Sequence, residues 1–190
     1  MKDLKDTIIK ETDVLPGDIL KVDSFLNHQI DIQLIAECGR AWYDKFKDEG
    51  ITKILTIESS GIAIASLTAQ YFGVPVVYAK KTRSATYGTD FYSTKVVSYT
   101  HSQSYDVSVS KKFISKEDKI LLIDDFLANG SALKGLISLA EMGGAKVAGA
   151  GVVIEKEYEN GGKDIRDLGY RIESLAKIKC IENGKIKFAD

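Results

Sequence analysis

The chain has few of the residues that hold small or secreted proteins together. Among its 190 residues there are only two cysteines, Cys38 and Cys180, and neither stands in a CxxC or His-Cys spacing. This pattern predicts neither a disulfide framework nor a zinc site, and we expect both thiols to be buried among apolar groups. A chain of this length buries about 70% of its unfolded surface, so its core needs no covalent support.

Membrane-spanning and targeting segments are also missing from the sequence. No apolar run approaches the ~18 residues of a transmembrane helix, and charged residues interrupt the N-terminus where a signal peptide needs an apolar segment. With 26 basic and 27 acidic residues the net charge is −1, so there is no basic field for duplex nucleic acid. The sequence predicts a cytoplasmic protein without membrane or nucleic-acid partners, in which any affinity for phosphate is local.

The most informative stretch is Ile120–Ala132. Its first four residues are apolar and predict a buried strand of a parallel sheet, ending at Asp124 and Asp125. Gly130 allows a tight turn, and the periodic segment after it predicts a helix over 131–142 whose N-terminus faces an anion. Carboxylates at the end of a central strand lie in the crevice where α/β sheets bind ligands. Because carboxylates accept hydrogen bonds from sugar hydroxyls and from waters of Mg²⁺, the combination predicts a phosphorylated-sugar site.

A second loop of this kind follows the strand predicted over 52–57. Ser59, Ser60 and Gly61 lead into a helix predicted over 62–72, although the Lys or Thr of a Walker loop is missing. The strand predicted over 73–79 completes a βαβ unit and ends at Lys80-Lys81, where a cation could meet a phosphate. Plainer interpretations stay open for all three features: a helix-capping turn at the two aspartates, an ordinary βα turn at Gly61, and two solvated lysines.

The rest of the chain predicts a second βαβ half and two leftover segments. Residues 82–110 are polar, with alternation only near Val96, Val107 and Val109, which is typical of a functional lid or a weakly ordered hairpin. The other predicted elements are an amphipathic helix at 1–10, irregular or short-strand structure at 14–30, a helix at 31–50 with Trp42 in the core, a strand at 146–155 ending in Glu155-Lys156-Glu157, a short helix at 163–168, extended chain at 170–176 and a hairpin turning at Asn183-Gly184.

The stretch Ile120–Ala132 resembles the phosphoribosyl-pyrophosphate (PRPP) motif of the type I phosphoribosyltransferases. It departs from that motif at Asn129 and Ala132, where the family usually carries threonines. The version Asp-Asp-Phe-Leu-Ala-Asn-Gly is similar to the one in the xanthine phosphoribosyltransferases. The segments 21–30, 57–63 and 154–156 resemble that group as well, so the similarity spans nearly the whole chain.

The resemblance implies an α/β fold with a central parallel sheet flanked by helices, in one domain over residues 1–190. A small hood of residues 1–30 and 170–190 would cover the carboxyl edge and select the base, while a mobile arm over 82–110 would close on PRPP. It further implies Mg²⁺ bound mainly through PRPP, no direct protein ligand to the metal, and a homodimer. The expected activity is purine salvage, in which xanthine and PRPP give xanthosine 5′-monophosphate (XMP) and pyrophosphate.

Site roles follow from the same resemblance, except those of Lys80 and Lys81, which follow from their place at the carboxyl edge of the sheet. The expected catalytic residues are Asp124 and Asp125. PRPP contacts are expected from Ala128, Asn129, Gly130, Ser131 and Ala132 at the 5-phosphate and from Ser59, Ser60, Gly61, Lys80 and Lys81 at the pyrophosphate, and base contacts from Leu20, Asn27 and Lys156.

Three alternatives to this assignment remain. The enzyme could prefer guanine or hypoxanthine, although relatives of that kind carry an aspartate as base where this chain has Ala128. A PRPP-sensing regulator on the same fold would need a DNA-binding segment, and no helix-turn-helix pattern or basic stripe is visible. A phosphoacceptor receiver would need its acid pair near the start of the chain rather than at residue 124.

Overall fold

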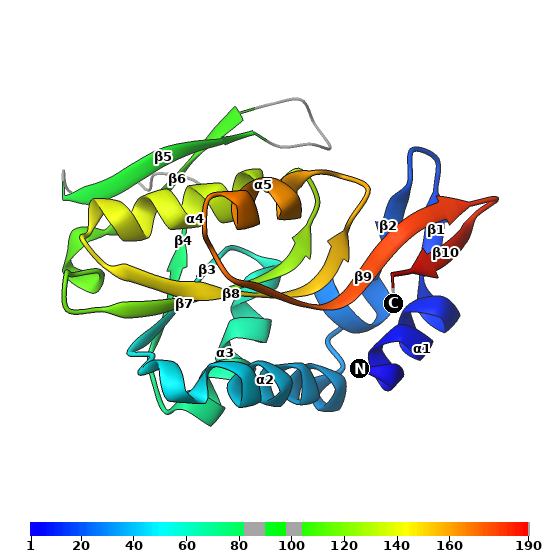
Figure 1. Ribbon diagram of the computed structural model, residues 1–190, viewed down its shortest axis with the longest axis horizontal. Helices are drawn as coiled ribbons and strands as arrows, with labels where there is room; N and C mark the ends of the chain where they lie inside the picture. Colours follow the sequence, from blue (N-terminus) through cyan, green and yellow to red (C-terminus); the bar gives the residue numbers. More distant parts are fainter. Residues whose placement is uncertain (82–89, 98–103, 190) are drawn as a thin grey trace.

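The computed structural model describes residues 1–81, 90–97 and 104–189, and its centre is a six-stranded sheet (Figure 1). The strand order is β10-β9-β8-β7-β3-β4. Five strands are parallel and one edge strand is antiparallel, which confirms the predicted α/β class with a mainly parallel sheet. The strands are β3 (Lys53–Ile57), β4 (Val76–Ala79), β7 (Lys119–Leu127), β8 (Lys146–Lys156), β9 (Ile172–Glu182) and the antiparallel β10 (Lys185–Phe188).

Helices cover both faces of this sheet (Figure 1). On one face lie α2 (Ile32–Phe46), continued by a 3-10 turn at Lys47–Glu49, and α3 (Ser60–Phe72); on the other lie α4 (Ser131–Met142) and α5 (Gly161–Asp167). Leu121 and Ile123 of β7 join the core beneath α2 and α3, whereas Ile120 and Leu122 join the core beneath α4. The predicted strand is thus buried on both faces. Among the described residues, no helix has the length and apolar character needed to cross a bilayer.

Glycines in β8 let α2 pack closely on the sheet. A Cβ on Gly149 would lie 2.7 Å from the Phe46 ring, and one on Gly151 would lie 2.8 Å from the ring of Trp42. Trp42 is fully buried, and its indole N–H donates to the carbonyl of Glu173 at 2.9 Å. The predicted core role of this tryptophan is confirmed, since its polar atom also has a partner.

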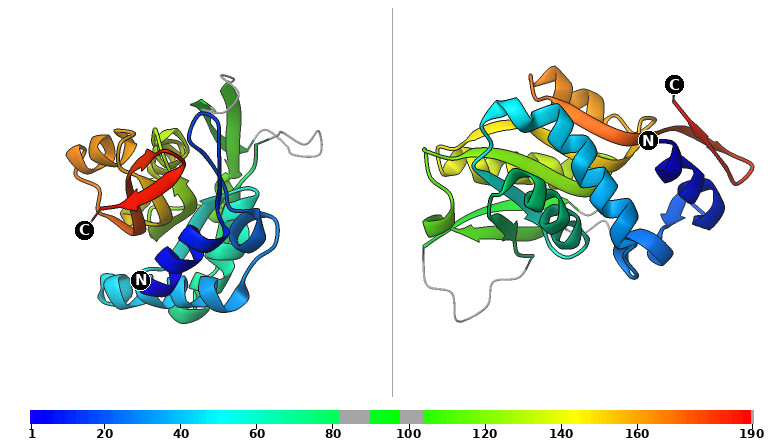
Figure 2. Two further views of the ribbon diagram at one scale, coloured as in Figure 1. Left: turned by 90° about the vertical axis from the view of Figure 1, so that its right-hand side faces the viewer. Right: turned by 90° about the horizontal axis from the view of Figure 1, so that it is seen from below.

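The two ends of the chain pack together at one end of the molecule (Figure 2). Leu4 and Ile8 are fully buried in the same cluster as Ile178 of β9, and the ammonium of Lys5 donates to the carbonyl of Ala189 at 3.3 Å. We keep the name hood for residues 1–30 and 170–190. Its first segment comprises α1 (Lys2–Glu11), the hairpin β1 (Asp13–Leu15) and β2 (Ile19–Lys21), and a π-helix at Asp23–Asn27.

The C-terminal hairpin turns as its sequence predicts. Asn183 and Gly184 both have positive φ, 52° and 72°, as a type I′ turn between antiparallel strands requires. The burial of the cysteines agrees only in part with the sequence prediction: Cys38 is buried, but Cys180 on β9 is partly exposed. For Cys180 the expectation of a buried thiol was wrong.

The described part of the arm is an antiparallel hairpin, β5 (Phe91–Val97) and β6 (Ser104–Ser110), followed by a 3-10 turn at Lys111–Phe113. Val96 and Val107 are buried in the core that includes α4, and Lys80 and Ser108 exchange two backbone hydrogen bonds of 2.9 Å. The hairpin alternative is therefore confirmed for these residues. Positions 82–89 and 98–103 of the predicted arm lie outside the described residues, and closure of the arm stays a prediction.

The end of the central strand was predicted wrongly. The sequence placed the end of the central strand at Ile123, but β7 continues to Leu127, and Asp124 is part of the strand. Phe126 and Leu127 pair with Ile154 and Glu155 of the neighbouring β8, so a long parallel partner satisfies the backbone beyond the apolar run.

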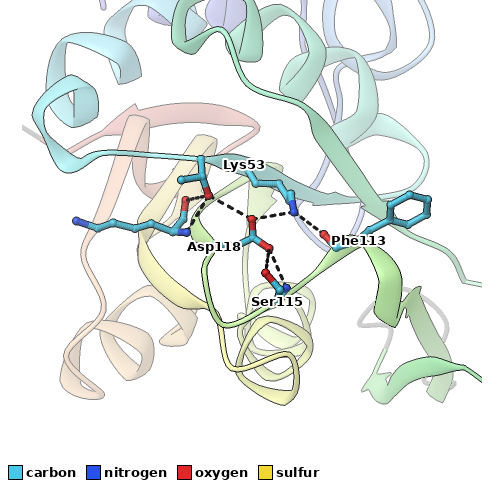
Figure 3. A network of polar contacts seen from close by, with 6 residues as sticks. Lys53, Phe113, Ser115 and Asp118 are labelled. Carbon is cyan, nitrogen blue, oxygen red and sulfur yellow. Dashed lines mark hydrogen bonds and ion pairs between the residues drawn. The ribbon is translucent and has the colours of Figure 1, made fainter.

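A polar network fixes the opposite, amino edge of the sheet (Figure 3). The ammonium of Lys53 on β3 lies 2.8 Å from a carboxylate oxygen of Asp118 and donates to the carbonyl of Phe113 at 2.6 Å. Ser115 donates to Asp118 from its backbone N–H at 2.8 Å and from its hydroxyl at 3.1 Å. Burial alone would raise the pKa of Asp118, but these hydrogen bonds outweigh burial and hold the pKa below its ordinary value. The network ties β3 to the start of β7 and so sets where their carboxyl ends meet.

Candidate active site

A cleft of about 420 Å³ opens at the carboxyl edge of the sheet. The loops after β3, β4, β7 and β8 border it, together with the hairpin β1–β2 of the hood and the hairpin β5–β6 of the arm. Every residue predicted for the site lines this cleft except Lys80. Convergence follows from topology, because parallel strands present their carboxyl ends at one edge.

The acid pair lies on the last part of β7 and borders the cleft. Asp124 is only 4% exposed and Asp125 is half-buried; the backbone N–H of Asp125 donates to Asp124 at 3.0 Å. Burial, and next the negative charge of Asp125, raises the pKa of Asp124 well above its ordinary value. Burial also raises the pKa of Tyr105 on β6, with a further contribution from the charge of Asp124. Asp124 therefore holds a proton more readily than an exposed aspartate does.

The loop that follows β7 is shaped by one glycine and one asparagine. Gly130 has φ 79°, a left-handed conformation that few other residues adopt, and caps α4. The side-chain oxygen of Asn129 accepts from the N–H of Ser131 at 2.9 Å, which holds the turn from within. The start of α4 borders the cleft, and the first N–H groups of a helix have no partner within the helix, which suits an anion.

The loop after β3 provides a second helix start at the cleft. Helix α3 begins at Ser60, two residues earlier than predicted, so Ser59 and Gly61 flank its first residue. A Cβ on Gly61 would lie only 2.0 Å from the hydroxyl oxygen of Thr56, so a larger residue would have to displace the Thr56 side chain. Glu58 accepts from the backbone N–H of Lys81 at 2.6 Å and joins this loop to the end of β4. The sequence did not single out Glu58.

The two consecutive lysines are separated by the structure. Lys81 lines the cleft, whereas Lys80 lines a different hollow together with Tyr78, and its ammonium lies 5.8 Å from the Tyr78 ring centre. Successive side chains of extended chain point to opposite sides, so only one of the two can face a given site. Of these two lysines, Lys81 is the one that lines the cleft and could contact an anion there.

Lys156 connects the end of β8 with the hood. Its ammonium donates to the backbone carbonyl of Asp18 at 3.0 Å and lies 3.5 Å from the carboxylate of Glu159. Leu20 and Asn27, from the N-terminal segment of the hood, line the same cleft. The three residues predicted to contact a base are thus brought together, although they come from distant parts of the sequence.

Glu155 does not face the cleft as the sequence suggested. It is 1% exposed and forms two hydrogen bonds of 2.7 Å with the guanidinium of Arg166 on α5; the hydroxyl of Ser174 also donates to it. Burial alone would raise the pKa of Glu155, but these hydrogen bonds outweigh it and the pKa lies below its ordinary value. Its role is to hold α5 on the sheet, and the predicted charge at this strand end is supplied to the cleft by Lys156 alone.

Several cleft residues escaped the sequence analysis. Val96, Val97 and Tyr105 reach the cleft from the arm, and Gly17 and Ile19 reach it from the β1–β2 hairpin. Alternation near the ends of the arm was the available signal for the valines. For Tyr105 no local pattern distinguished it from the other tyrosines of that region.

Comparison with known proteins agrees with this geometry. Residues 22–181 match the family model described as phosphoribosyl transferase domain. The chain is 49% identical to xanthine phosphoribosyltransferase of Ruminiclostridium cellulolyticum over 100% of both chains, and 53% identical to that of Lachnoclostridium phytofermentans over 99% of this chain and 98% of the relative.

Solved structures at low sequence identity share the fold. Adenine phosphoribosyltransferase of Thermoanaerobacter pseudethanolicus superposes with a TM-score of 0.74 at 18% identity, covering 93% of this chain and 98% of that one. The Trypanosoma brucei enzyme of the same name reaches 0.76 at 17% identity, covering 92% and 79%. The chain belongs to the phosphoribosyltransferase family and, within it, to the xanthine phosphoribosyltransferases.

Proposed function

We propose that the protein transfers the phosphoribosyl group of PRPP to a ring nitrogen of xanthine, giving XMP and pyrophosphate. The observation that supports this most strongly is that one cleft combines an acid pair, a loop with Gly130 at the start of a helix, and Lys156 at the end of β8. Each group matches one part of the reaction: the ribose, the 5-phosphate and the base.

Charge development at the ribose is the central difficulty of the reaction. When pyrophosphate leaves, the anomeric carbon becomes oxocarbenium-like, and a purine nitrogen attacks it. Asp124 and Asp125 accept hydrogen bonds from the ribose hydroxyls, which holds the ring in place, and their charge stabilises the positive carbon. Water that would hydrolyse PRPP is excluded when the arm, represented here by Val97 and Tyr105 at the cleft, closes over the substrate.

The two phosphate groups of PRPP go to the two helix starts. Backbone amides of 128–132 bind the 5-phosphate, and those of 59–61 bind the pyrophosphate together with the ammonium of Lys81. Backbone N–H groups at a helix start, unlike carboxylates, are the chemistry that an anion requires.

The acid pair also fits a magnesium ion that arrives with PRPP. Among the described residues, no three His, Cys, Asp or Glu side chains gather to hold a metal directly. Mg²⁺ commonly keeps several waters and takes its other ligands from substrate phosphates, so Asp124 and Asp125 would bind those waters. When bound, the ion neutralises charge on the leaving pyrophosphate.

The base is selected by hydrogen bonds to its carbonyl groups. An ammonium has three N–H donors; in Lys156 the carbonyl of Asp18 and the carboxylate of Glu159 occupy two directions, which leaves one for a purine carbonyl. Asn27 would meet the ring edge, and Leu20 its apolar face. Xanthine has one more carbonyl than hypoxanthine and is more acidic. Because Ala128 supplies no general base, attack by the xanthine anion is the route that needs least help.

A direct assay tests this proposal. Purified protein is incubated with PRPP and Mg²⁺ and with xanthine, guanine, hypoxanthine or adenine in turn, and the nucleotide formed is measured. XMP should form with the highest kcat/KM. A higher kcat/KM for guanine or hypoxanthine would show that the proposed preference for xanthine is wrong. PRPP binding without any product would favour a PRPP-sensing protein. We include a cytoplasmic homodimer in the proposal; light scattering of the purified protein tests its stoichiometry.

A further inference from the structure

The start of α5 lies directly against the loop that follows β7. A Cβ on Gly161 would lie 2.3 Å from the carbonyl oxygen of Ala128, 2.3 Å from the carbonyl carbon of Asn129 and 2.4 Å from the nitrogen of Gly130. All three atoms are backbone, so no side chain could turn away to make room. Conversely, a Cβ on Gly130 would lie 3.2 Å from the Cα of Gly161. The two glycines let two backbones touch.

Glycine is required at position 161 because of its contact with the loop 128–130, and not because of its backbone conformation. Gly130 has a left-handed φ of 79°, so its identity follows from conformation alone. Gly161 is the first residue of α5 and is absent from the positions with positive φ. An alanine would fit its backbone conformation and is the better helix former. What excludes alanine is the proximity of the loop 128–130.

Helix α5 cannot easily retreat from the loop. The bidentate pair of Arg166 with the buried Glu155 anchors it to β8. A Cβ on Gly162 would lie 2.0 Å from a carboxylate oxygen of Glu155, so the first turn of α5 packs directly against the Glu155–Arg166 ion pair. Ile165 is fully buried, and its Cδ1 would lie 3.0 Å from a Cβ on Gly130. The helix is therefore a rigid surface behind the loop.

We propose that Gly161 is a positioning residue for PRPP. The start of α5, lacking a side chain, is the platform against which residues 128–130 take the shape that presents their amides to the 5-phosphate. This inference rests on the proposed function for the identity of the ligand. With alanine at 161, the loop backbone must move about 1 Å to reach the ordinary contact distance of 3.4 Å. Displacements of ~1 Å at positioning groups can cost about a hundredfold in rate.

The test compares Gly161→Ala with a matched control, Gly143→Ala. A Cβ on Gly143, at the far end of α4, would lie 2.4 Å from a side-chain carbon of Ile114, so that variant also adds a methyl group at a crowded glycine but spares the loop. Binding of PRPP with Mg²⁺ and without purine is measured by calorimetry, and the KM values for PRPP and xanthine are measured separately. Gly161→Ala should raise the Kd and KM for PRPP at least tenfold, with the KM for xanthine at saturating PRPP within twofold of wild type. Gly143→Ala should leave all three within twofold.

A second variant decides the case if Gly161→Ala does not fold. Arg166→Lys loosens the anchor of α5 without adding atoms, because lysine cannot form the bidentate pair with Glu155. We expect an approximately threefold rise in the Kd for PRPP and an unchanged KM for xanthine. The inference is overturned if folded Gly161→Ala binds PRPP as wild type does, or, where that variant is unfolded, if Arg166→Lys does. PRPP binding by the wild type without nucleotide formation would instead refute the proposed function alone.

Discussion

Replacing Asp124 by asparagine should make the protein more stable and far less active. The carboxyl group of Asp124 is 4% exposed, and burial together with the charge of Asp125 raises its pKa well above the ordinary value. Ionised Asp124 therefore weakens the native state of the free enzyme. Asparagine removes the charge but keeps a side-chain oxygen that can accept from the N–H of Asp125. The ribose loses a charged acceptor, so we expect kcat/KM to fall by more than about a hundredfold, or ~2.7 kcal/mol.

The stabilisation should depend on pH in a defined direction. Unfolded aspartate has a pKa of about 3.9. Since the native pKa of Asp124 is higher, the native state retains a proton that the unfolded state releases, and the contribution of Asp124 to the free energy of unfolding falls as the pH rises from ~4 through the native pKa. The asparagine variant does not show this decrease in the free energy of unfolding, because its side chain does not ionise. Its advantage over wild type should be near zero below pH ~4 and grow toward pH 8.

The size of the advantage follows from burying an ionised carboxylate beside a second acid, which costs on the order of 1–3 kcal/mol. For a protein of this length each kcal/mol shifts the melting temperature by ~2–4 °C. Urea unfolding of both proteins at pH 4, 6 and 8 gives the difference directly. Asp44→Asn, on the exposed side of α2, reports the effect of removing a carboxylate from the surface. A destabilised Asp124→Asn at pH 8, or an advantage that does not change with pH, would refute the reasoning.

Three further outcomes test other parts of the structure. Lys156→Ala should lower kcat/KM for xanthine about ten- to a hundredfold by loss of a charged hydrogen bond, with PRPP affinity unchanged; weaker PRPP binding would assign this lysine to the phosphates. Amides of 91–97 and 104–110 should exchange more slowly with PRPP and Mg²⁺ bound, and equal exchange would count against closure of the arm. Asp118→Asn should lower the free energy of unfolding by about 1–3 kcal/mol at pH 7 while KM values persist. Because the native pKa of Asp118 is lowered, this deficit should shrink as the pH falls from ~4 through that pKa, and a constant deficit would contradict the assignment.

Elements that depend on local pattern could be predicted from the sequence. The helix over 131–142 agrees with α4 residue for residue, and Asn183-Gly184 forms the expected turn. The end of β7 could not be predicted in this way. Its last residues are held by the ladder to β8, a partner whose length is not encoded near Asp124. Strand ends that lie in a ligand crevice are where such nonlocal pairing overrides the pattern of apolar residues.

The convergence of the cleft residues was predictable, but the separation of Lys80 from Lys81 was missed. Parallel strands bring their carboxyl ends to one edge, so the two loops and the acid pair had to meet. The alternation of side chains in extended chain was equally available and would have placed only one of the lysines in the cleft. No pattern in the sequence indicated the contact of Gly161 with Asn129. Asn160-Gly161-Gly162 before a helix is also the sequence of an ordinary turn, and only the neighbouring backbone shows why glycine stands there.

The contrast between Glu155 and Asp124 shows what the sequence leaves undetermined. Both are acids near the carboxyl end of a central strand, and both are almost fully buried. Glu155 has a bidentate guanidinium partner, so its pKa is lowered, and its charge pairs with Arg166 and holds α5 on the sheet. Asp124 has a second acid beside it instead, so burial and next the charge of Asp125 raise its pKa, and it borders the cleft, where a ligand could reach it. Among the described residues, Glu155 thus differs from Asp124 in having a bidentate guanidinium partner, and this difference depends on where Arg166 of α5 packs in three dimensions.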